Sequence, residues 1–246
     1  MTPFAIKSVP EFLLSPREFD FPRRIKPHQF YVGGFPDLER SDPNYDLAFR
    51  ARFAPLRAQR AAGRPLVYCA LGSIAWRYAG AVDFLARLVH AAEGQRWNLL
   101  LATGSDFDAR TFHPLPANVT LCQRVPQVEV LRAADVMVTH GGMNSIKECI
   151  ALGVPMLVYP GGSDIDQGGN SARVIYHGLG QRGRMRRDSV ARIRAAIDQL
   201  LGDPRFRRDV AAMSARIEAS DAHRHSAEIV EHSLSLQPSH AILTSS

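Results

Sequence analysis

The chain has 246 residues, of which 46% are hydrophobic, with a formal net charge of +6 and a pI of about 9.6. This length and composition are typical of a soluble globular protein with a sizeable core, in one large or two small domains. No run approaches the ~20 apolar residues that a membrane span requires, and the start, MTPFAIKSVPEF, lacks the basic and apolar blocks of a secretory signal. We therefore expect a cytoplasmic protein.

The positive charge permits nucleic acid or an anionic membrane surface as a partner. Basic residues are densest in the stretch QRGRMRRDSVARIRAA at 181–196. This stretch lacks the interleaved aromatic residues on which nucleic-acid bases stack. We interpret it as a solvated helix face and expect no nucleic-acid partner, while a phosphate-bearing ligand or a lipid surface stays open.

The three cysteines, Cys69, Cys122 and Cys149, each lie inside an apolar segment. They form no CxxC pair and have no spacing typical of metal ligands. We therefore expect buried thiols, with neither a disulfide nor a metal site.

The first 62 residues are rich in proline and have few helical patterns outside an Ala/Arg-rich stretch at 46–62. They indicate a linker of extended chain that wraps around a domain. We place the domain itself at 63–233 and a flexible tail at 234–246.

From Leu66 onward, short apolar strands alternate with amphipathic helical stretches, a pattern typical of a parallel sheet covered on both faces. The pattern predicts strands at 66–72, 98–103, 119–123, 135–139 and 155–159, and a weak one at 181–185. It predicts helices at 79–92, 144–152, 167–177, 189–201 and 205–219. The expected fold class is therefore α/β, with a doubly wound, Rossmann-like parallel sheet.

Ligands bind such sheets at the carboxyl ends of the strands, where the strand order changes direction. Two strand ends carry suitable residues, LGS at 71–73 and HGG at 140–142. Glycines let the backbone approach a ligand, and the free N–H groups of a helix that starts near Asn144 favour an anion such as phosphate. Asn144, Ser145 and His140 add side-chain donors. A structural alternative is a capping box formed by Ser145 and Glu148.

A polar loop, GGSDIDQGGNSAR at 161–173, follows the next predicted strand and begins another helix from the same edge. Asp166 and Gln167 in this loop suit a polyol, because a carboxylate and an amide together can bind adjacent sugar hydroxyls.

The span HGGMNSIKECIALGVPMLVYPGGSDIDQGGNSARVIYHGLG at 140–180, with VPQ at 125–127 and LGS at 71–73, resembles the donor-binding half of the UDP-glycosyltransferase family. The specific features are a histidine followed by Asn and Ser four and five residues later, Glu eight residues later, GVP, and a late D-Q-x-x-N. The resemblance covers most of residues 65–220. It implies the C-terminal half of a two-domain GT-B fold.

The resemblance also implies roles for individual residues. The diphosphate contacts would be Ser73, His140, Gly142, Met143, Asn144 and Ser145. The ribose and base contacts would be Glu148 for the ribose hydroxyls and Arg124, Val125 and Gln127 along the base. Asp166 and Gln167 would hold the donor sugar. Because protein groups neutralise the diphosphate, the resemblance implies neither a metal nor a cofactor beyond the UDP-sugar or TDP-sugar substrate.

The sequence departs from the family pattern in two places. Arg124 stands where plant members have a tryptophan under the base, which leaves UDP and TDP open because arginine can also stack on a base. The loop between Pro160 and Asp166 is two residues longer than in plant members, so Asp164 competes with Asp166 for the sugar.

Family members have an N-terminal domain that binds the acceptor, a small molecule or lipid, and carries the catalytic base. The opening FLLSPREFDFPRRIKPHQFYVGG resembles the end of that domain and the crossover. We therefore expect a C-terminal fragment or one subunit of a split enzyme, with no catalytic base of its own. The intact enzyme would transfer the sugar to an acceptor hydroxyl with inversion, whereas this chain alone would bind nucleotide with little or no transfer.

Two alternatives share the fold. One is a nucleotide-sugar epimerase, which would convert UDP-N-acetylglucosamine without an acceptor. The other is a non-catalytic nucleotide-binding module.

Overall fold

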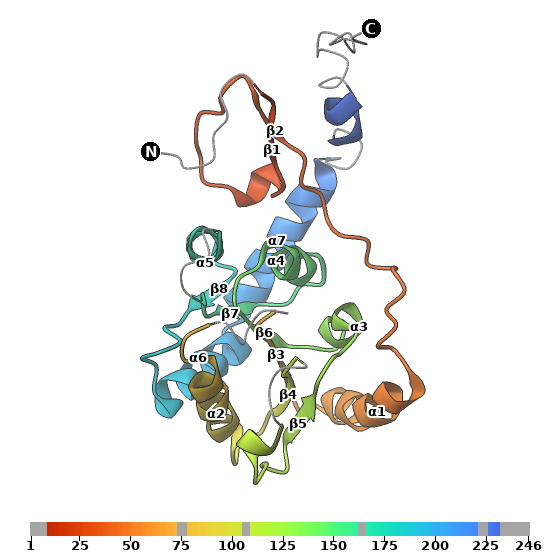
Figure 1. Cartoon of the computed structure of the whole chain (residues 1–246), viewed down its shortest axis with the longest axis vertical. Coiled ribbons are helices and arrows are strands. Elements are labelled where there is room, and N and C mark those ends of the chain that lie inside the picture. The colour runs from red at the N-terminus through yellow and green to blue at the C-terminus, as the bar shows by residue number, and fades with distance from the viewer. Residues whose placement is uncertain (1–8, 73–77, 105–108, 162–165, 221–225, 232–246) are drawn as a thin grey trace, which may run out of the picture. The chain divides into compact units, whose positions relative to one another are not determined.

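The computed structural model describes residues 9–72, 78–104, 109–161, 166–220 and 226–231 (Figure 1). The chain divides into two compact units, one formed by residues 36–214 and the other by residues 1–35 together with 215–246. The predicted boundaries at 62 and 233 stay predictions, and the predicted tail at 234–246 lies outside the described residues. No helix in the described part of the chain is long and apolar enough to cross a membrane.

The larger unit is built on a six-stranded parallel sheet with the strand order β5-β4-β3-β6-β7-β8. The strands are β3 (Leu66–Ala70), β4 (Asn98–Ala102), β5 (Val119–Cys122), β6 (Val136–Thr139), β7 (Met156–Val158) and β8 (Gly180–Arg182). The order reverses between the central neighbours β3 and β6, so the predicted α/β, doubly wound sheet is confirmed. Each predicted strand is present, and most are shorter at the carboxyl end.

Helices cover both faces of this sheet (Figure 1). They are α1 (Leu47–Ala61), α2 (Ala81–Ala92), α3 (Gln127–Leu131), α4 (Met143–Ala151), α5 (Gln167–Tyr176), α6 (Val190–Gly202) and α7 (Pro204–Ala219), with a 3-10 helix at Ala109–Phe112. On one face, α2 and α6 pack together over Cys69 and Leu101. On the other face, the Sγ of Cys149 in α4 lies 3.2 Å from the Sδ of Met137.

Strand β8 and helix α3 are two of the elements that differ from the sequence prediction. Strand β8 begins at Gly180, a residue before the predicted start, because Gly180 pairs with Met156. A Cβ at Gly180 would lie 1.9 Å from the Met156 carbonyl oxygen, so only glycine fits this register. Helix α3 was not predicted, since its five residues are too few for a helical period to appear.

Polar side chains at the amino ends of the strands connect the sheet to the helices. Asp135, directly before β6, accepts hydrogen bonds from the Leu66 N–H at 2.8 Å, from Arg60 in α1 at 3.2 Å and from Arg207 in α7 at 2.5 Å. Asn118, directly before β5, donates to the Ala92 carbonyl at the end of α2. This edge is therefore held by long-range bonds between secondary-structure elements.

The smaller unit contains a parallel pair of short strands, β1 (Glu11–Leu13) and β2 (Gln29–Tyr31), and a 3-10 helix at Arg17–Phe19. Asp20 is its buried centre, where the carboxylate accepts hydrogen bonds from Arg23 Nε at 2.7 Å and from the Tyr31 hydroxyl. Burial and the bond to Asp20 raise the pKa of Tyr31.

Candidate functional site

The two predicted strand ends lie side by side at the carboxyl edge of the sheet. Ala70 in β3 pairs with Thr139 in β6, and this register brings Gly72 next to His140. A Cβ on Gly72 would lie 2.9 Å from Cε1 of His140, and one on Gly142 would lie 2.7 Å from its Nε2. The imidazole ring therefore fits closely between two glycines, and a Cβ at either position would displace it. The prediction that both strand ends share one edge is confirmed.

Helix α4 begins at Met143, directly after this pair of glycines, with Gly142 as its N-cap. No side chain caps the helix, so the capping-box alternative is wrong: Ser145 is already the third residue of the helix. The N–H groups of the first turn have no partner within the helix and point to the carboxyl edge. Together with the helix dipole they favour an anion at this position. Asn144 is exposed beside them, while Met143 and Ser145 are half-buried.

Glu148 is buried one turn further along α4, and both of its carboxylate oxygens are engaged. Oε2 accepts a hydrogen bond from Gln127 Nε2 at 2.6 Å, and Oε1 accepts one from Arg40 Nη2 at 2.5 Å. Gln127 also donates to the Ser145 hydroxyl at 3.1 Å and accepts from the Tyr68 hydroxyl at 3.1 Å. Gln127 therefore orients Glu148 and Ser145, a role that the sequence did not indicate.

A second network lies on the other side of His140. Gln167 is buried at the start of α5, where its Oε1 accepts from the Gly161 N–H at 2.7 Å and its Nε2 donates to the Tyr78 hydroxyl at 2.8 Å. The Tyr78 ring stacks on His140, with centroids 6.1 Å apart and planes at 28°. Both amide atoms of Gln167 are thus bonded within the protein, and Tyr78 is a site residue that the sequence did not indicate.

Asp166 precedes α5 and is exposed. Its Oδ2 accepts a hydrogen bond from Asn170 Nδ2 at 3.2 Å, and the same amide group donates to the Gly141 carbonyl at 3.0 Å. Asn170 therefore links the exposed carboxylate to the glycine pair after β6. The predicted contacts Ser73 and Asp164 lie outside the described residues.

The predicted base contacts follow strand β5. Val125 is buried, whereas Arg124 is exposed and lines a pocket of about 490 Å³ together with residues of the α1 start. The other lining residues are Asn44, Asp46, Ala48, Phe49, Arg52, Cys122 and Gln123. Arg124 is thus placed at a concave surface on the carboxyl side of the sheet, as a base contact requires.

All three cysteines are free and buried, as the sequence predicted. Burial raises the pKa of Cys69 and that of Cys149. Burial also raises the pKa of Cys122, where the neighbouring Arg52 acts in the opposite direction. None of these thiols is therefore a ready nucleophile at neutral pH.

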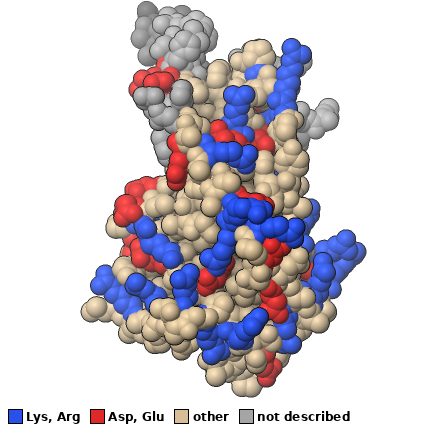
Figure 2. All heavy atoms as spheres, turned by 180° about the vertical axis from the view of Figure 1, so that it is seen from behind, with Lys and Arg blue, Asp and Glu red and all other residues tan. Residues whose placement is uncertain are grey.

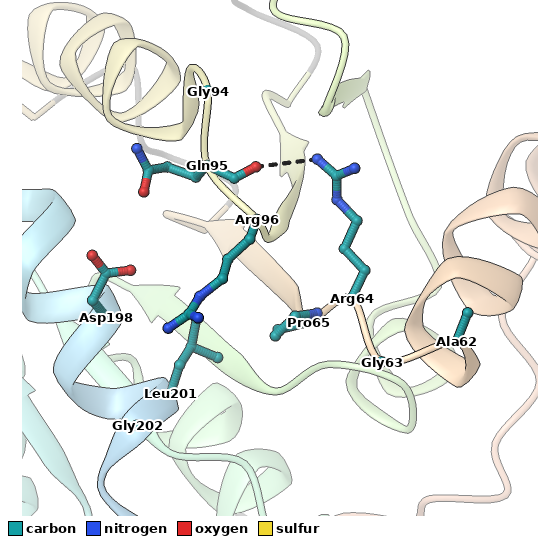
Figure 3. A pocket seen from close by; sticks show the side chains of 10 residues that line it. All are labelled: Ala62, Gly63, Arg64, Pro65, Gly94, Gln95, Arg96, Asp198, Leu201 and Gly202. Carbon is teal, nitrogen blue, oxygen red and sulfur yellow. Dashed lines mark hydrogen bonds between the residues drawn. The ribbon is translucent and has the colours of Figure 1, made fainter.

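A larger pocket of about 590 Å³ lies at the opposite, amino edge of the sheet (Figure 3). It is bordered by the carboxyl ends of α1, α2 and α6, and the guanidinium of Arg64 donates to the Gln95 carbonyl at 3.1 Å. Carbonyl groups and the negative ends of three helix dipoles disfavour an anion here. We therefore interpret the arginines of this pocket as partners of the carbonyl groups at the helix ends and not as contacts for an anionic ligand.

The arginine-rich stretch near 181–196 is consistent with a solvated surface. Arg184, Arg186 and Arg187 are exposed, and Arg194 donates to the His90 and Ala91 carbonyls at the end of α2. On the face shown in Figure 2, basic and acidic side chains are interspersed. This distribution differs from the continuous basic surface expected of a nucleic-acid binder.

The parallel sheet with its glycine-lined switch point defines a Rossmann-like α/β protein, and the solved structures that it resembles are GT-B glycosyltransferases. Residues 102–236, more than half of the chain, match the family described as "Erythromycin biosynthesis protein CIII-like, C-terminal domain". The chain belongs to this family of glycosyltransferase domains, and the predicted resemblance to UDP-glycosyltransferases is confirmed.

Individual relatives agree with this assignment. The NDP-glycosyltransferase YjiC of Bacillus licheniformis is 31% identical over 171 residues, which cover 69% of this chain and 41% of the relative. The calicheamicin glycosyltransferase CalG4 matches with a TM-score of 0.69 at 25% identity, over 92% of this chain and 53% of its own. The glycosyltransferase of kitacinnamycin matches with a TM-score of 0.71 at 26% identity, over 91% of this chain and 54% of its own. The chain thus spans about half the length of these relatives.

Proposed function

We propose that this chain is the half of a glycosyltransferase that binds the nucleoside diphosphate sugar, either a UDP-sugar or a dTDP-sugar. The observation that carries the proposal is the position of His140 between two glycines, beside the uncapped start of α4 and at the switch point of the sheet. Backbone N–H groups and an imidazole at one sheet edge suit a diphosphate.

The remaining contacts follow from this placement. His140, Ser145 and the backbone at Gly142 to Asn144 hold the diphosphate, with Ser73 from the adjoining strand end. Glu148 accepts hydrogen bonds from the ribose hydroxyls, in an orientation set by Gln127. The base lies along Arg124 and Val125. Asp166 contacts the donor sugar. Gln167 lies beside the same sugar position and holds the Gly161 backbone there.

The transfer inverts the anomeric centre. A base on the acceptor-binding domain removes a proton from the acceptor hydroxyl, whose oxygen attacks the anomeric carbon as the bond to the diphosphate breaks. The half described here stabilises the negative charge that develops on the leaving diphosphate, through the N-terminus of α4 and His140. These protein donors make the reaction independent of a metal ion. The chain alone binds nucleotide without transferring sugar.

Calorimetric titration with UDP, dTDP and GDP tests the proposal. We expect saturable binding of UDP or dTDP, weakened about 100-fold by His140→Ala because a charge-assisted hydrogen bond is lost and its donor position becomes empty. Glu148→Ala should weaken binding of the same nucleotide. The matched controls are His90→Ala and Glu93→Ala, which change exposed residues at the carboxyl end of α2. Unchanged affinity in both site variants would refute the proposed site.

A further inference from the structure

Arg40 reaches the proposed ribose position from a distant part of the chain. It lies in the segment 36–46, which has neither helix nor strand, and its Nη2 donates to Glu148 Oε1 at 2.5 Å. Its Nη1 donates to the Asp37 carbonyl at 2.8 Å. The Glu148 side chain is 4% exposed, whereas that of Arg40 is 38% exposed. Arg40 therefore covers the carboxylate from the solvent side.

A ribose cannot reach Glu148 while both oxygens are engaged and the side chain is buried, so one of its two partners must move. Gln127 is held firmly, because it is the first residue of α3. Its side chain also accepts a hydrogen bond from the Tyr68 hydroxyl and donates one to the Ser145 hydroxyl. Arg40 has one bond besides the pair with Glu148 and stands on an irregular segment. Arg40 is the partner that gives way at the lowest cost.

Arg40 and a ribose offer the same kind of group to Glu148, a hydrogen-bond donor. Arg40 offers one N–H, from Nη2 to Oε1, and a ribose hydroxyl can donate to the same oxygen. We propose that Arg40 occupies the ribose position on Glu148 in the nucleotide-free protein, and that a nucleotide binds by displacing it. The inference rests on the proposed donor site. It adds to that site a nucleotide-free state in which a side chain of the same protein occupies the ribose position.

The segment itself stays anchored when Arg40 leaves. Arg132 donates to the Leu38 carbonyl at 3.0 Å and to Glu39 Oε1 at 2.7 Å, two residues or fewer from Arg40. Displacement is therefore a side-chain movement on a held backbone. The apparent affinity for nucleotide is reduced by the fraction of molecules in which Glu148 is covered.

The test compares Arg40→Gln with Arg23→Gln by calorimetry. Both substitutions remove one guanidinium of similar exposure, 38% and 37%, that pairs with a buried carboxylate, but only Arg40 contacts Glu148. We expect Arg40→Gln to bind UDP about tenfold more tightly than the unchanged chain, because a bond to a charged group no longer has to be broken. Arg23→Gln should change the UDP affinity less than twofold. Pyrophosphate, which has no ribose, should bind both variants with similar affinity.

Unchanged or weaker UDP binding by Arg40→Gln, or an equal gain in Arg23→Gln, overturns the inference. Thermal unfolding of each variant establishes that it is folded, and Arg40→Lys, which keeps the charge but has no planar fork, should show a smaller gain than Arg40→Gln. If UDP binds and Glu148→Ala weakens it while Arg40→Gln has no effect, only this inference fails. If neither the chain nor any variant binds nucleotide, the proposed function fails with it.

Discussion

The two edges of the central sheet use polar side chains for different purposes. At the amino edge, Asp135 is bonded to the backbone of another strand and to side chains of α1 and α7. At the carboxyl edge, Gln127 and Glu148 bond to each other and to the side chains of Tyr68, Ser145 and Arg40, while Gln167 bonds to Tyr78 and to the Gly161 backbone. Gly72 and Gly142 make room for the His140 ring at this edge.

Pocket size favours the edge opposite the proposed site. The larger pocket, about 590 Å³, is at the amino edge beside helix carboxyl ends (Figure 3). The proposal of a site at the carboxyl edge rests on chemistry, namely a helix N-terminus without a side-chain cap and an imidazole held by its neighbours. We therefore expect substitutions at the amino edge to lower stability and substitutions at the carboxyl edge to change binding.

The largest effect is expected from Asp135→Ala at the amino edge. The substitution removes the acceptor of the Leu66 N–H and leaves Arg60 and Arg207 without their carboxylate. We expect the free energy of unfolding to fall by about 3–4 kcal/mol in urea titrations, with the UDP affinity of the folded protein unchanged. A variant that stays as stable as the parent, or one that loses UDP binding while folded, would break the division between the edges.

Two buried thiols, Cys69 in β3 and Cys149 in α4, should make the stability of the fold depend on alkaline pH. Burial raises the pKa of Cys69 and of Cys149 above that of a free thiol. The folded state therefore disfavours the thiolate. The stability that the two neutral thiols contribute is complete below the unfolded pKa near 8.5 and declines as pH rises above it. Between pH 7.5 and 9.5 the two thiols together should lower the free energy of unfolding by about 3 kcal/mol. Urea titrations at several pH values measure the free energy of unfolding. Cys69→Ala should reduce its dependence on pH in this range.

A smaller effect on binding is expected from Gly142→Ala at the carboxyl edge. The backbone of Gly142 has φ −65°, which any residue adopts, but the added Cβ would lie 2.7 Å from His140 Nε2. Displacing the ring should weaken UDP binding about tenfold, equivalent to about 1.4 kcal/mol. In a His140→Ala background the same substitution should have little effect, because the clash is gone. Equal losses in both backgrounds would show that His140 is not the affected contact.

The smallest effect is expected from Asp166→Ala. Asp166 is exposed, and Asn170 stands between its carboxylate and the glycine pair before α4. We expect calorimetry to show about fivefold weaker binding of UDP-glucose or dTDP-glucose, since one hydrogen bond is lost, and unchanged binding of UDP or dTDP. Equal losses for nucleotide and nucleotide sugar would place Asp166 outside the sugar position.

The order of strands and helices could be predicted because buried parallel strands are continuous apolar runs. The glycines after β6 could also be predicted as a ligand edge, since a strand that ends in HGG before a helix has a specific local meaning. The side-chain amides were harder to interpret. Gln167 was expected at the sugar, yet its amide bonds to Tyr78 and Gly161, and a sequence shows no such pairing across 89 residues.

The sequence by itself determined the fold class and the family resemblance, and it indicated the edge where we propose that a ligand binds, because these depend on local periodicity and spacing. Only the tertiary structure decided which groups touch: Arg40 on Glu148 and Tyr78 on His140. The segment of Arg40 has no periodic pattern, and its contact with Glu148 joins residues 108 positions apart. Such contacts arise from the packing of the whole unit, and no local sequence signal encodes them.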